Sequence, residues 1–235
     1  MTQESVTVCV FCGSSFGNNP IFEETAKKLG NAIADKKWGL VYGGGSTGLM
    51  GVIASSASRN GNGSHVHGII PTALISRERT EEIKQESDTT NDESDSLNSK
   101  LKESINNHDG STPIPNSLKY GKTTLVKDMH TRKKLMSQES QVFIALPGGF
   151  GTLEELMEIV TWKQLSIHNK QVILFNIDGF FDNFLKFLKD CINNEFISAK
   201  NGKIIEVATS VEEVIELVEN YKPTEGTFNL KWDTT

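Results

Sequence analysis

The segment LPGGFGTLEEL, residues 146–156, combines residue types that could hold and process a phosphorylated ligand. Its glycines, Gly148, Gly149 and Gly151, carry no Cβ that would keep a ligand away from the backbone N–H groups. A predicted helix follows from Thr152, and the N–H groups at a helix N-terminus bind anions well. The sequence therefore predicts a phosphate site at this loop.

Two glutamates, Glu154 and Glu155, stand beside the predicted phosphate site, in the expected first turn of its helix. Acidic side chains in a first turn complement the helix dipole by about 0.3–1 kcal/mol each, which is a purely structural explanation. A carboxylate beside a phosphate site also suits the hydroxyl groups of a sugar phosphate, or an attacking water. The basic run MHTRKK supplies cations: Arg132 is the main candidate, and Lys133 and Lys134 are either ligands or part of a solvated helix face.

Two further glycine-rich loops follow apolar runs, at residues 13–17 and 43–48. The first matches G-x-S-x-G, the nucleophile loop of serine hydrolases, but its helix starts several residues after Ser15, which disfavours a catalytic serine. The second matches the G-x-G-x-x-G fingerprint of NAD-binding folds, but the next strand ends in GIIPTA, without the acidic residue that binds the ribose. Tight turns without a ligand would explain one or two such loops. Three of them favour a nucleotide-phosphate site.

Short apolar runs alternate with helical patterns along most of the chain. Apolar strands that alternate with helices indicate a parallel sheet covered on both faces. We therefore predict an α/β fold with a Rossmann-like, doubly wound parallel sheet, whose ligands lie at the carboxyl ends of the strands. The predicted strands are 6–11, 39–42, 65–70, 142–146, 171–177 and 203–208, and the predicted helices begin near Pro20 and Leu49 or cover 127–140, 152–164, 184–192 and 211–221.

The segment 81–117 interrupts this alternation. It contains no aromatic residue, nine acidic residues and three lysines, and Ser, Asn and Thr dominate the rest. Such a composition buries too little apolar area to offset the entropy of ordering the segment. We therefore predict a disordered insertion within a single nucleotide-binding domain that spans residues 1–235. A short amphipathic helix around Leu97, Leu101 and Ile105 is the alternative.

The composition argues against several classes of partner. A net charge of −6 and a pI near 5.5 disfavour binding to nucleic acid or to an anionic membrane. No apolar run reaches the roughly 20 residues of a membrane span, and the N-terminus lacks the pattern of a secretory signal. A location in the cytoplasm, or in both the cytoplasm and the nucleus, is therefore expected. Three cysteines do not form a secreted disulfide framework, and Cys9 and Cys12 are expected on opposite faces of one strand.

Other candidate sites are weaker. His65 and His67 are expected on one face of a strand, but no third ligand is evident, so no metal site is predicted. His130 and His168 are interpreted as structural residues. A decarboxylase that uses pyridoxal phosphate would need a suitable lysine site, and nothing around the basic run forms one.

Several segments together resemble one family, the LONELY GUY (LOG) family of cytokinin riboside 5′-monophosphate phosphoribohydrolases, formerly described as lysine decarboxylase-like. The resemblance covers residues 7 to about 75 and 125 to about 220. Its most specific part is the combination of P-G-G-x-G-T-x-x-E with M-H-x-R-K. The segments that carry it are FCGSSFGNNP, LVYGGGSTGLMG, GIIP, MHTRKKLM, LPGGFGTLEEL, TWKQLSIHNKQV and FNIDGFFDNFL.

The resemblance implies cleavage of the N-glycosidic bond of a purine nucleoside 5′-monophosphate, giving the free base and ribose 5-phosphate without a metal or organic cofactor. It implies that Arg132 and Glu155 are catalytic, that Glu154 contacts the ribose or a water, and that the protein forms a homodimer. The substrate-binding residues that it implies are Ser14, Gly44, Gly45, Met129, Lys133, Gly148, Gly149, Gly151, Thr152 and Glu154.

The chemistry of the bond agrees with this assignment. Breaking a ribosyl C–N bond builds positive charge on the sugar, which a carboxylate such as Glu155 can stabilise while it activates water. No second acid clearly protonates the departing base. Two alternatives stay open: a nucleosidase for AMP or other nucleoside monophosphates, and a nucleotide-binding protein without turnover, in which both glutamates only cap a helix. The long insertion leaves the base specificity open.

Overall fold

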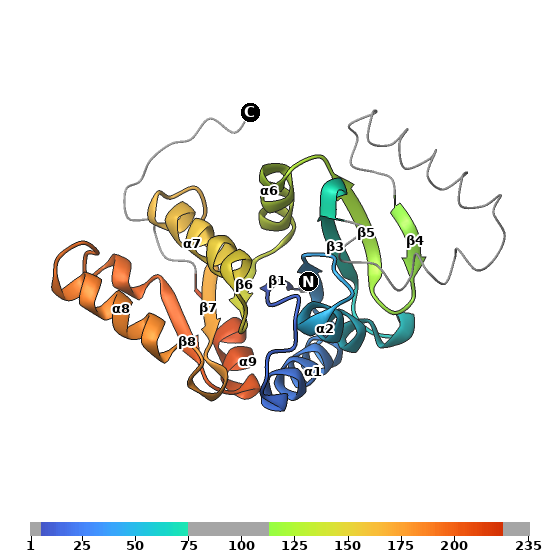
Figure 1. Cartoon of the computed structure of the whole chain (residues 1–235), viewed down its shortest axis with the longest axis horizontal. Helices are drawn as coiled ribbons and strands as arrows, with labels where there is room; N and C mark the ends of the chain where they lie inside the picture. Colours follow the sequence, from blue (N-terminus) through green and yellow to red (C-terminus); the bar gives the residue numbers. More distant parts are fainter. Residues whose placement is uncertain (1–5, 75–112, 223–235) are drawn as a thin grey trace.

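An eight-stranded sheet organises residues 6–74 and 113–222, the part of the chain that the computed structural model describes (Figure 1). The predicted α/β class is confirmed, and each of the predicted strands is present. The strands are β1 (Thr7–Phe11), β2 (Gly39–Tyr42), β3 (Val66–Pro71), β4 (Pro113–Ser117), β5 (Gly121–Val126), β6 (Val142–Ala145), β7 (Gln171–Phe175) and β8 (Ile205–Ala208). The described α-helices are α1 (Pro20–Asp35), α2 (Gly48–Ser58), α6 (Met129–Glu139), α7 (Phe150–Gln164), α8 (Asp182–Asn193) and α9 (Val211–Asn220).

Strand β1 lies where the sheet changes its direction of growth. The strand order is β4-β5-β3-β2-β1-β6-β7-β8, and all neighbours are parallel except β4 and β5. From β1 the chain builds outward through β2 and β3, and after β5 it returns through α6 to place β6 on the other side of β1. Ligands of doubly wound sheets bind at the carboxyl ends of the strands at such a switch point. The loops that follow β1 and β6 are therefore the expected ligand site.

Two strands were not predicted from the sequence. β5 begins GKTT, and its polar residues hide its burial: Thr123 and Thr124 are both buried, and Thr124 Oγ1 is 2.7 Å from His67 Nε2 on β3. β4 occupies the last five residues of the predicted disordered insertion, so that boundary was wrong. Antiparallel pairing with β5 gives this polar segment backbone hydrogen bonds that its own composition does not indicate. Residues 81–112 of the predicted insertion lie outside the described residues.

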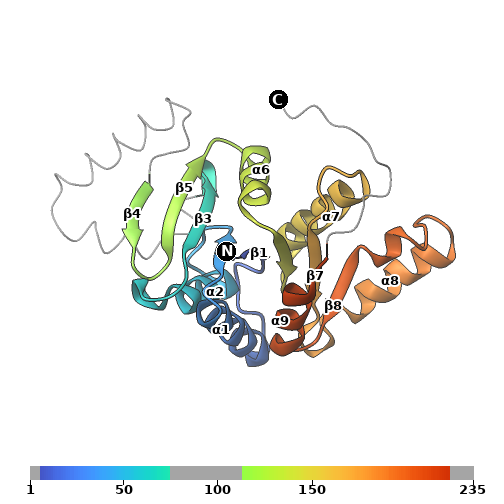
Figure 2. The ribbon, with the colours of Figure 1, turned by 180° about the vertical axis from the view of Figure 1, so that it is seen from behind.

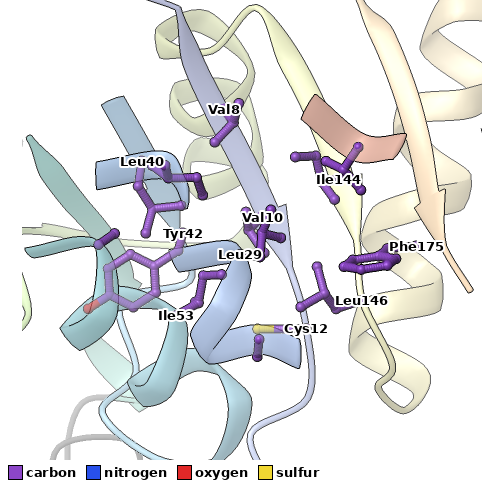
Figure 3. Packing of buried hydrophobic residues seen from close by; sticks show 14 of the residues in the cluster. Val8, Val10, Cys12, Leu29, Leu40, Tyr42, Ile53, Ile144, Leu146 and Phe175 are labelled. Carbon is purple, nitrogen blue, oxygen red and sulfur yellow. The ribbon is translucent and has the colours of Figure 1, made fainter. Parts of the chain in front are cut away.

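Helices cover both faces of the sheet (Figure 2). Each layer has its own apolar cluster. One cluster joins α1, α2 and α9 to the sheet, with Leu29, Ile53 and Val10 among its members (Figure 3), and the other joins α6, α7 and α8 to the opposite face. Cys12 belongs to the first cluster and Cys9 to the second, and both thiols are free. The predicted placement of these cysteines on opposite faces is confirmed.

Local signals explain where α1 begins but not where α7 begins. Pro20 is the first residue of α1, as predicted, and the side chain of Asn19 caps the helix by accepting a 3.1 Å hydrogen bond from Ile21 N. Helix α7 begins at Phe150, two residues earlier than predicted, with Gly149 as its N-cap.

No membrane-spanning helix is found within the described ranges 6–74 and 113–222.

The earlier start of α7 corrects the reading of its glutamates. Glu154 and Glu155 lie beyond the first turn, which contains no acidic residue. The helix dipole acts mainly on the first turn. Compensation of the dipole therefore does not account for these two carboxylates, and their partners must be sought in the tertiary structure.

Candidate active site

The three glycine-rich loops pack against one another at the carboxyl ends of β1, β2 and β6. Gly13 N donates a 3.0 Å hydrogen bond to Pro147 O, and Gly13 O accepts a 3.1 Å hydrogen bond from Leu49 N. A Cβ on Gly48 would overlap the backbone of Ser14, so only glycine allows this approach. The loop after β1 is thus fixed between the other two loops, at the switch point of the sheet.

The N-terminus of α7 forms an open, glycine-lined surface. Gly149 and Gly151 are exposed, and a Cβ on either would have no neighbouring atom within 4 Å. Gly149 caps the helix without a side-chain hydrogen bond. Thr152, in the first turn of α7, is buried. Its side chain packs so closely on Gly148 that a Cβ on Gly148 would overlap it. This arrangement suits an anion held by backbone N–H groups.

Arg132 of α6 and Glu155 of α7 form a buried ion pair beside this surface. Arg132 Nη2 lies 3.3 Å from Glu155 Oε1, and the two side chains are only 7% and 9% exposed. Nη2 also donates a 3.4 Å hydrogen bond to Gly43 O, where a Cβ would collide with the guanidinium. The Arg132 Nε atom is buried and has no hydrogen-bond partner among the described residues. The two residues that the family resemblance implies to be catalytic are therefore in contact.

Lys133 contacts carboxylates of α7 rather than an open surface. Its Nζ donates to Glu154 Oε1 and lies 2.8 Å from Glu158 Oε2, and its side chain is 10% exposed. Burial opposes the charge on this amine, but hydrogen bonds to Glu154 and Glu158 outweigh it and hold the pKa of Lys133 above its usual value. Lys133 and Glu154, both predicted to bind substrate, therefore bind each other in this structure.

The remaining predicted residues lie around the same loops but differ in exposure. Ser14 is exposed, and Met129 is 39% exposed with its Sδ 3.6 Å from Arg132 Nη1. Gly44 and Gly45 are buried, and Gly44 has a φ of +80° and packs so tightly on Ile70 that a Cβ would overlap it. The glycine at position 44 is thus needed for packing against β3, whatever ligand the loop binds.

Comparisons with known proteins place the chain in a family. The family model described as "Possible lysine decarboxylase" matches residues 50–218, and that of the SLOG cluster4 family matches residues 5–92. "Cytokinin riboside 5′-monophosphate phosphoribohydrolase LOG7" from Arabidopsis thaliana is 38% identical over 96% of this chain and 88% of its own length. LOG1 from the same plant is 40% identical over 92% of this chain and 84% of its own length.

The chain belongs to the LOG family. Its LOG relatives are named as phosphoribohydrolases, which are enzymes. A solved structure with the same fold, the molybdenum cofactor binding protein from Rippkaea orientalis, has a TM-score of 0.58 and 19% identity over 93% of this chain and 98% of that chain. At this identity the likeness concerns the fold alone.

One residue of the LOG site was missed from the sequence. Glu158 lies one helical turn after Glu154 on α7, so both carboxylates can meet the same amine. The spacing of four residues indicates that Glu154 and Glu158 share one face of the helix, but it does not indicate which residue they contact. Only the packing of α6 on α7 shows that the partner is Lys133.

The two histidines predicted on one face of a strand, His65 and His67, differ in burial and in contacts. His65 is exposed before β3 begins, whereas His67 is buried between Glu139, 2.6 Å from its Nδ1, and Thr124, so the two do not share an environment. Within the described ranges, no group of three or more His, Cys, Asp or Glu residues could hold a metal ion. A cavity of about 520 Å³ lies elsewhere, between α9, β8 and the end of α7, and none of the predicted site residues lines it.

His168 should make the stability of this LOG protein depend on pH. Nε2 donates to Ile159 O at 3.0 Å and Nδ1 accepts from Lys170 N at 3.1 Å, which satisfies the neutral ring. Burial is the main reason that its pKa falls to about 4, and the charges of Lys170 and Lys163 add to the effect. The unfolded histidine, with a pKa near 6.5, binds a proton first as the pH falls. The folded state should therefore lose up to about 3 kcal/mol between pH 7 and pH 4.

Urea unfolding of the wild type and of His168→Gln at pH 7 and pH 5 measures this effect. The variant should lose less stability than the wild type over this interval, because glutamine does not titrate. The exposed His130→Gln variant is the matched control and should keep the wild-type dependence. Equal losses in all three proteins would contradict the role of His168.

Proposed function

We propose that this protein hydrolyses the N-glycosidic bond of N6-modified adenosine 5′-monophosphates to the free base and ribose 5-phosphate. The observation that supports this most strongly is the buried pair of Arg132 and Glu155 beside the glycine-lined N-terminus of α7. It brings a cation and a carboxylate to one place, where a phosphate and a ribose could both be held. The names of the LOG relatives support the substrate class.

In this proposal the phosphate binds at the N-terminus of α7. Backbone N–H groups of the glycine loop and the hydroxyl of Thr152 are its donors, and the residues assigned to it are Gly148, Gly149, Gly151 and Thr152. The exposed, unobstructed surface at Gly149 and Gly151 supports this assignment. The guanidinium of Arg132, whose Nε has no other described partner, supplies a positive charge for the same anion.

Glu155 is assigned to the sugar. As the bond between C1′ and N9 breaks, its electron pair leaves with the base and positive charge develops on the ribose, which the Glu155 carboxylate stabilises. A water whose proton Glu155 accepts then forms the new bond to C1′. A proton relayed through a second water neutralises the departing base, and that water takes up the proton held by Glu155, so that the carboxylate is restored and one water is consumed in all. Arg132 holds Glu155 in position.

The other assigned residues line the nucleotide. Ser14 and the glycines Gly44 and Gly45 belong to the loops that meet at β1, and Met129 borders Arg132. Glu154 is exposed enough, at 51% of its side chain, to reach a ribose hydroxyl while Lys133 holds one of its oxygens. These roles follow from the family resemblance and are part of the proposal.

A nucleosidase for AMP is the second candidate, and a binding protein without turnover is the third. Incubation with N6-isopentenyl AMP, AMP and N6-isopentenyladenosine, followed by measurement of the free base and ribose 5-phosphate, separates them. We expect release from N6-isopentenyl AMP at least about tenfold faster than from AMP, and hardly any from the nucleoside, which lacks the phosphate. Equal rates for the two nucleotides would favour the AMP nucleosidase. Binding without release would refute the hydrolase.

We also propose that the enzyme is a homodimer. Phe150, between the two exposed glycines at the start of α7, is 95% exposed, and Met129 next to the catalytic arginine is 39% exposed. Large apolar side chains beside a site favour burial against a second copy. Light scattering during gel filtration should give twice the mass of 25.9 kDa. The acidic composition and the nucleotide substrate favour a cytoplasmic location, with or without a nuclear pool, which a fluorescent fusion would test.

A further inference from the structure

Glu158 is a partly buried acid of α7 that neither the sequence motifs nor the proposed reaction uses. Its Oε2 lies 2.8 Å from Lys133 Nζ, and its side chain is 22% exposed. Apart from this ion pair, the buried Oε2 atom has no hydrogen-bond partner among the described residues. Lys133 is therefore the one partner of this oxygen among the described residues.

Lys133 in turn depends on α7 for its charge. Its side chain is 10% exposed, so burial disfavours the ammonium form, and the hydrogen bonds to Glu158 and Glu154 restore it. Glu154 is the more solvated partner, with 51% of its side chain exposed against 22% for Glu158. Solvent screens the exposed pair more strongly. Glu158 is therefore the less solvated of the two carboxylates that hold Lys133 on α7.

The neighbour of Lys133 on α6 is Arg132, which contacts the Glu155 carboxylate on α7. Adjacent residues of one helix thus bind adjacent residues of the other: Lys133 spans Glu154 and Glu158, one helical turn apart, and Arg132 meets Glu155 between them. The 3.3 Å distance between Arg132 and Glu155 is already longer than that of an ideal charged hydrogen bond. This ion pair alone is therefore a weak restraint on the position of α6 along α7. A shift of α6 along α7 would move the guanidinium away from the carboxylate.

We propose that Glu158 is a positioning residue, which acts through Lys133 to set α6 on α7 so that Arg132 meets Glu155. Lys133 is then also a positioning residue, and its amine is not primarily a substrate ligand. The inference rests on the proposed hydrolase function, since the geometry that it protects is that of the catalytic pair. It predicts that Glu158 affects the rate of the chemical step and hardly affects the affinity for the nucleotide.

A double-mutant cycle tests this proposal with Glu158→Gln, Lys133→Met and the double variant. Each single variant should lower kcat for N6-isopentenyl AMP by about tenfold to 100-fold, with KM changed less than about threefold, because catalysis is sensitive to displacements near 1 Å. Each should also lower the urea midpoint, since Lys133 loses one of its two carboxylate partners in Glu158→Gln, and Glu158 loses its ion-pair partner in Lys133→Met. In the double variant both charges are absent, so the midpoint should recover while kcat stays as low as in the single variants.

Two further proteins complete the experiment. Lys163→Met removes a buried lysine from the other end of α7 and should leave kcat unchanged. Lys133→Arg keeps the positive charge and should restore part of the kcat lost in Lys133→Met.

Each alternative outcome would overturn the inference in a recognisable way. Recovery of kcat together with the midpoint in the double variant would show that Glu158 serves stability alone. Single variants with wild-type kcat would remove any positioning role, and a large rise in KM at constant kcat would make Lys133 a substrate ligand instead. An inactive wild type would refute the proposed function itself, and with it this inference, whereas an active wild type with unaffected variants refutes the inference only. If a single variant does not fold, kcat of the double variant still decides whether Glu158 positions the catalytic pair or serves stability alone.

Discussion

Glu155→Gln is expected to release ribose 5-phosphate from N6-isopentenyl AMP about 1,000-fold more slowly than the wild type. Glutamine has the same shape and can still accept a hydrogen bond from Arg132, but it cannot carry the negative charge that the ribose needs as the bond breaks. KM should change little, because the phosphate is held elsewhere, at the N-terminus of α7. Initial rates over a range of substrate concentrations measure kcat and KM, and calorimetry measures the affinity for AMP.

The matched control for this variant is Glu212→Gln, an exposed acid in the first turn of α9. It removes the same charge from a helix that supplies no residue to the glycine loops or to the assigned site, and it should keep full activity. Full activity in Glu155→Gln would refute the role assigned to this carboxylate. Loss of AMP binding in that variant would instead indicate that Glu155 serves to hold the nucleotide rather than to cleave it.

Gly48→Ala is expected to lower the free energy of unfolding by about 2–5 kcal/mol and to impair nucleotide binding. Gly48 has a φ of +55°, a conformation that costs a residue with a Cβ about 1–2 kcal/mol. The new methyl group would also overlap the backbone of Ser14 and Ser15, and such overpacking costs about 1–3 kcal/mol more. Since these backbone atoms cannot rotate away as a side chain could, the loop after β1 must move out of the site.

Urea unfolding and AMP titration measure these two effects. Gly149→Ala is the control for stability: its φ is −100° and a Cβ would meet no atom within 4 Å, so its unfolding midpoint should match that of the wild type. A Gly48→Ala protein as stable as the wild type would show that the contact between the loops after β1 and β2 is not rigid. The loops would then not form the fixed surface on which the phosphate site depends.

Much of the fold could be predicted from the sequence because most of its strands and helices carry their own hydrophobic pattern. The runs that form β1 and β7 are almost entirely apolar, which is typical of strands covered on both faces. β5 escaped this reading since Thr123 and Thr124 are polar yet buried, and the partner that makes the burial of Thr124 acceptable, His67, is 57 residues away. β4 was missed for a similar reason: its pairing partner, rather than its own residues, makes it a strand.

The candidate site divides in the same way. The glycine loop before α7 and the basic run that contains Arg132 were visible in the sequence, and the structure brings Arg132 to Glu155 as the family resemblance implies. The start of α7 was misplaced, since Gly149 caps the helix without a side chain that would mark it. That error made the glutamates look like first-turn residues and concealed their need for tertiary partners.

By itself, the sequence determined the parallel α/β sheet and the three glycine loops at the carboxyl ends of its strands. These features depend on apolar runs and on glycines, whose effect on the backbone is local. The tertiary structure alone decided which carboxylate each cation meets. Lys133 is bound to Glu154 and Glu158, and Arg132 is left to Glu155, because α6 packs on α7 in one register. Electrostatic partners are chosen by distance in space, and in this site that distance is set by helix packing across a chain separation of 21 residues or more.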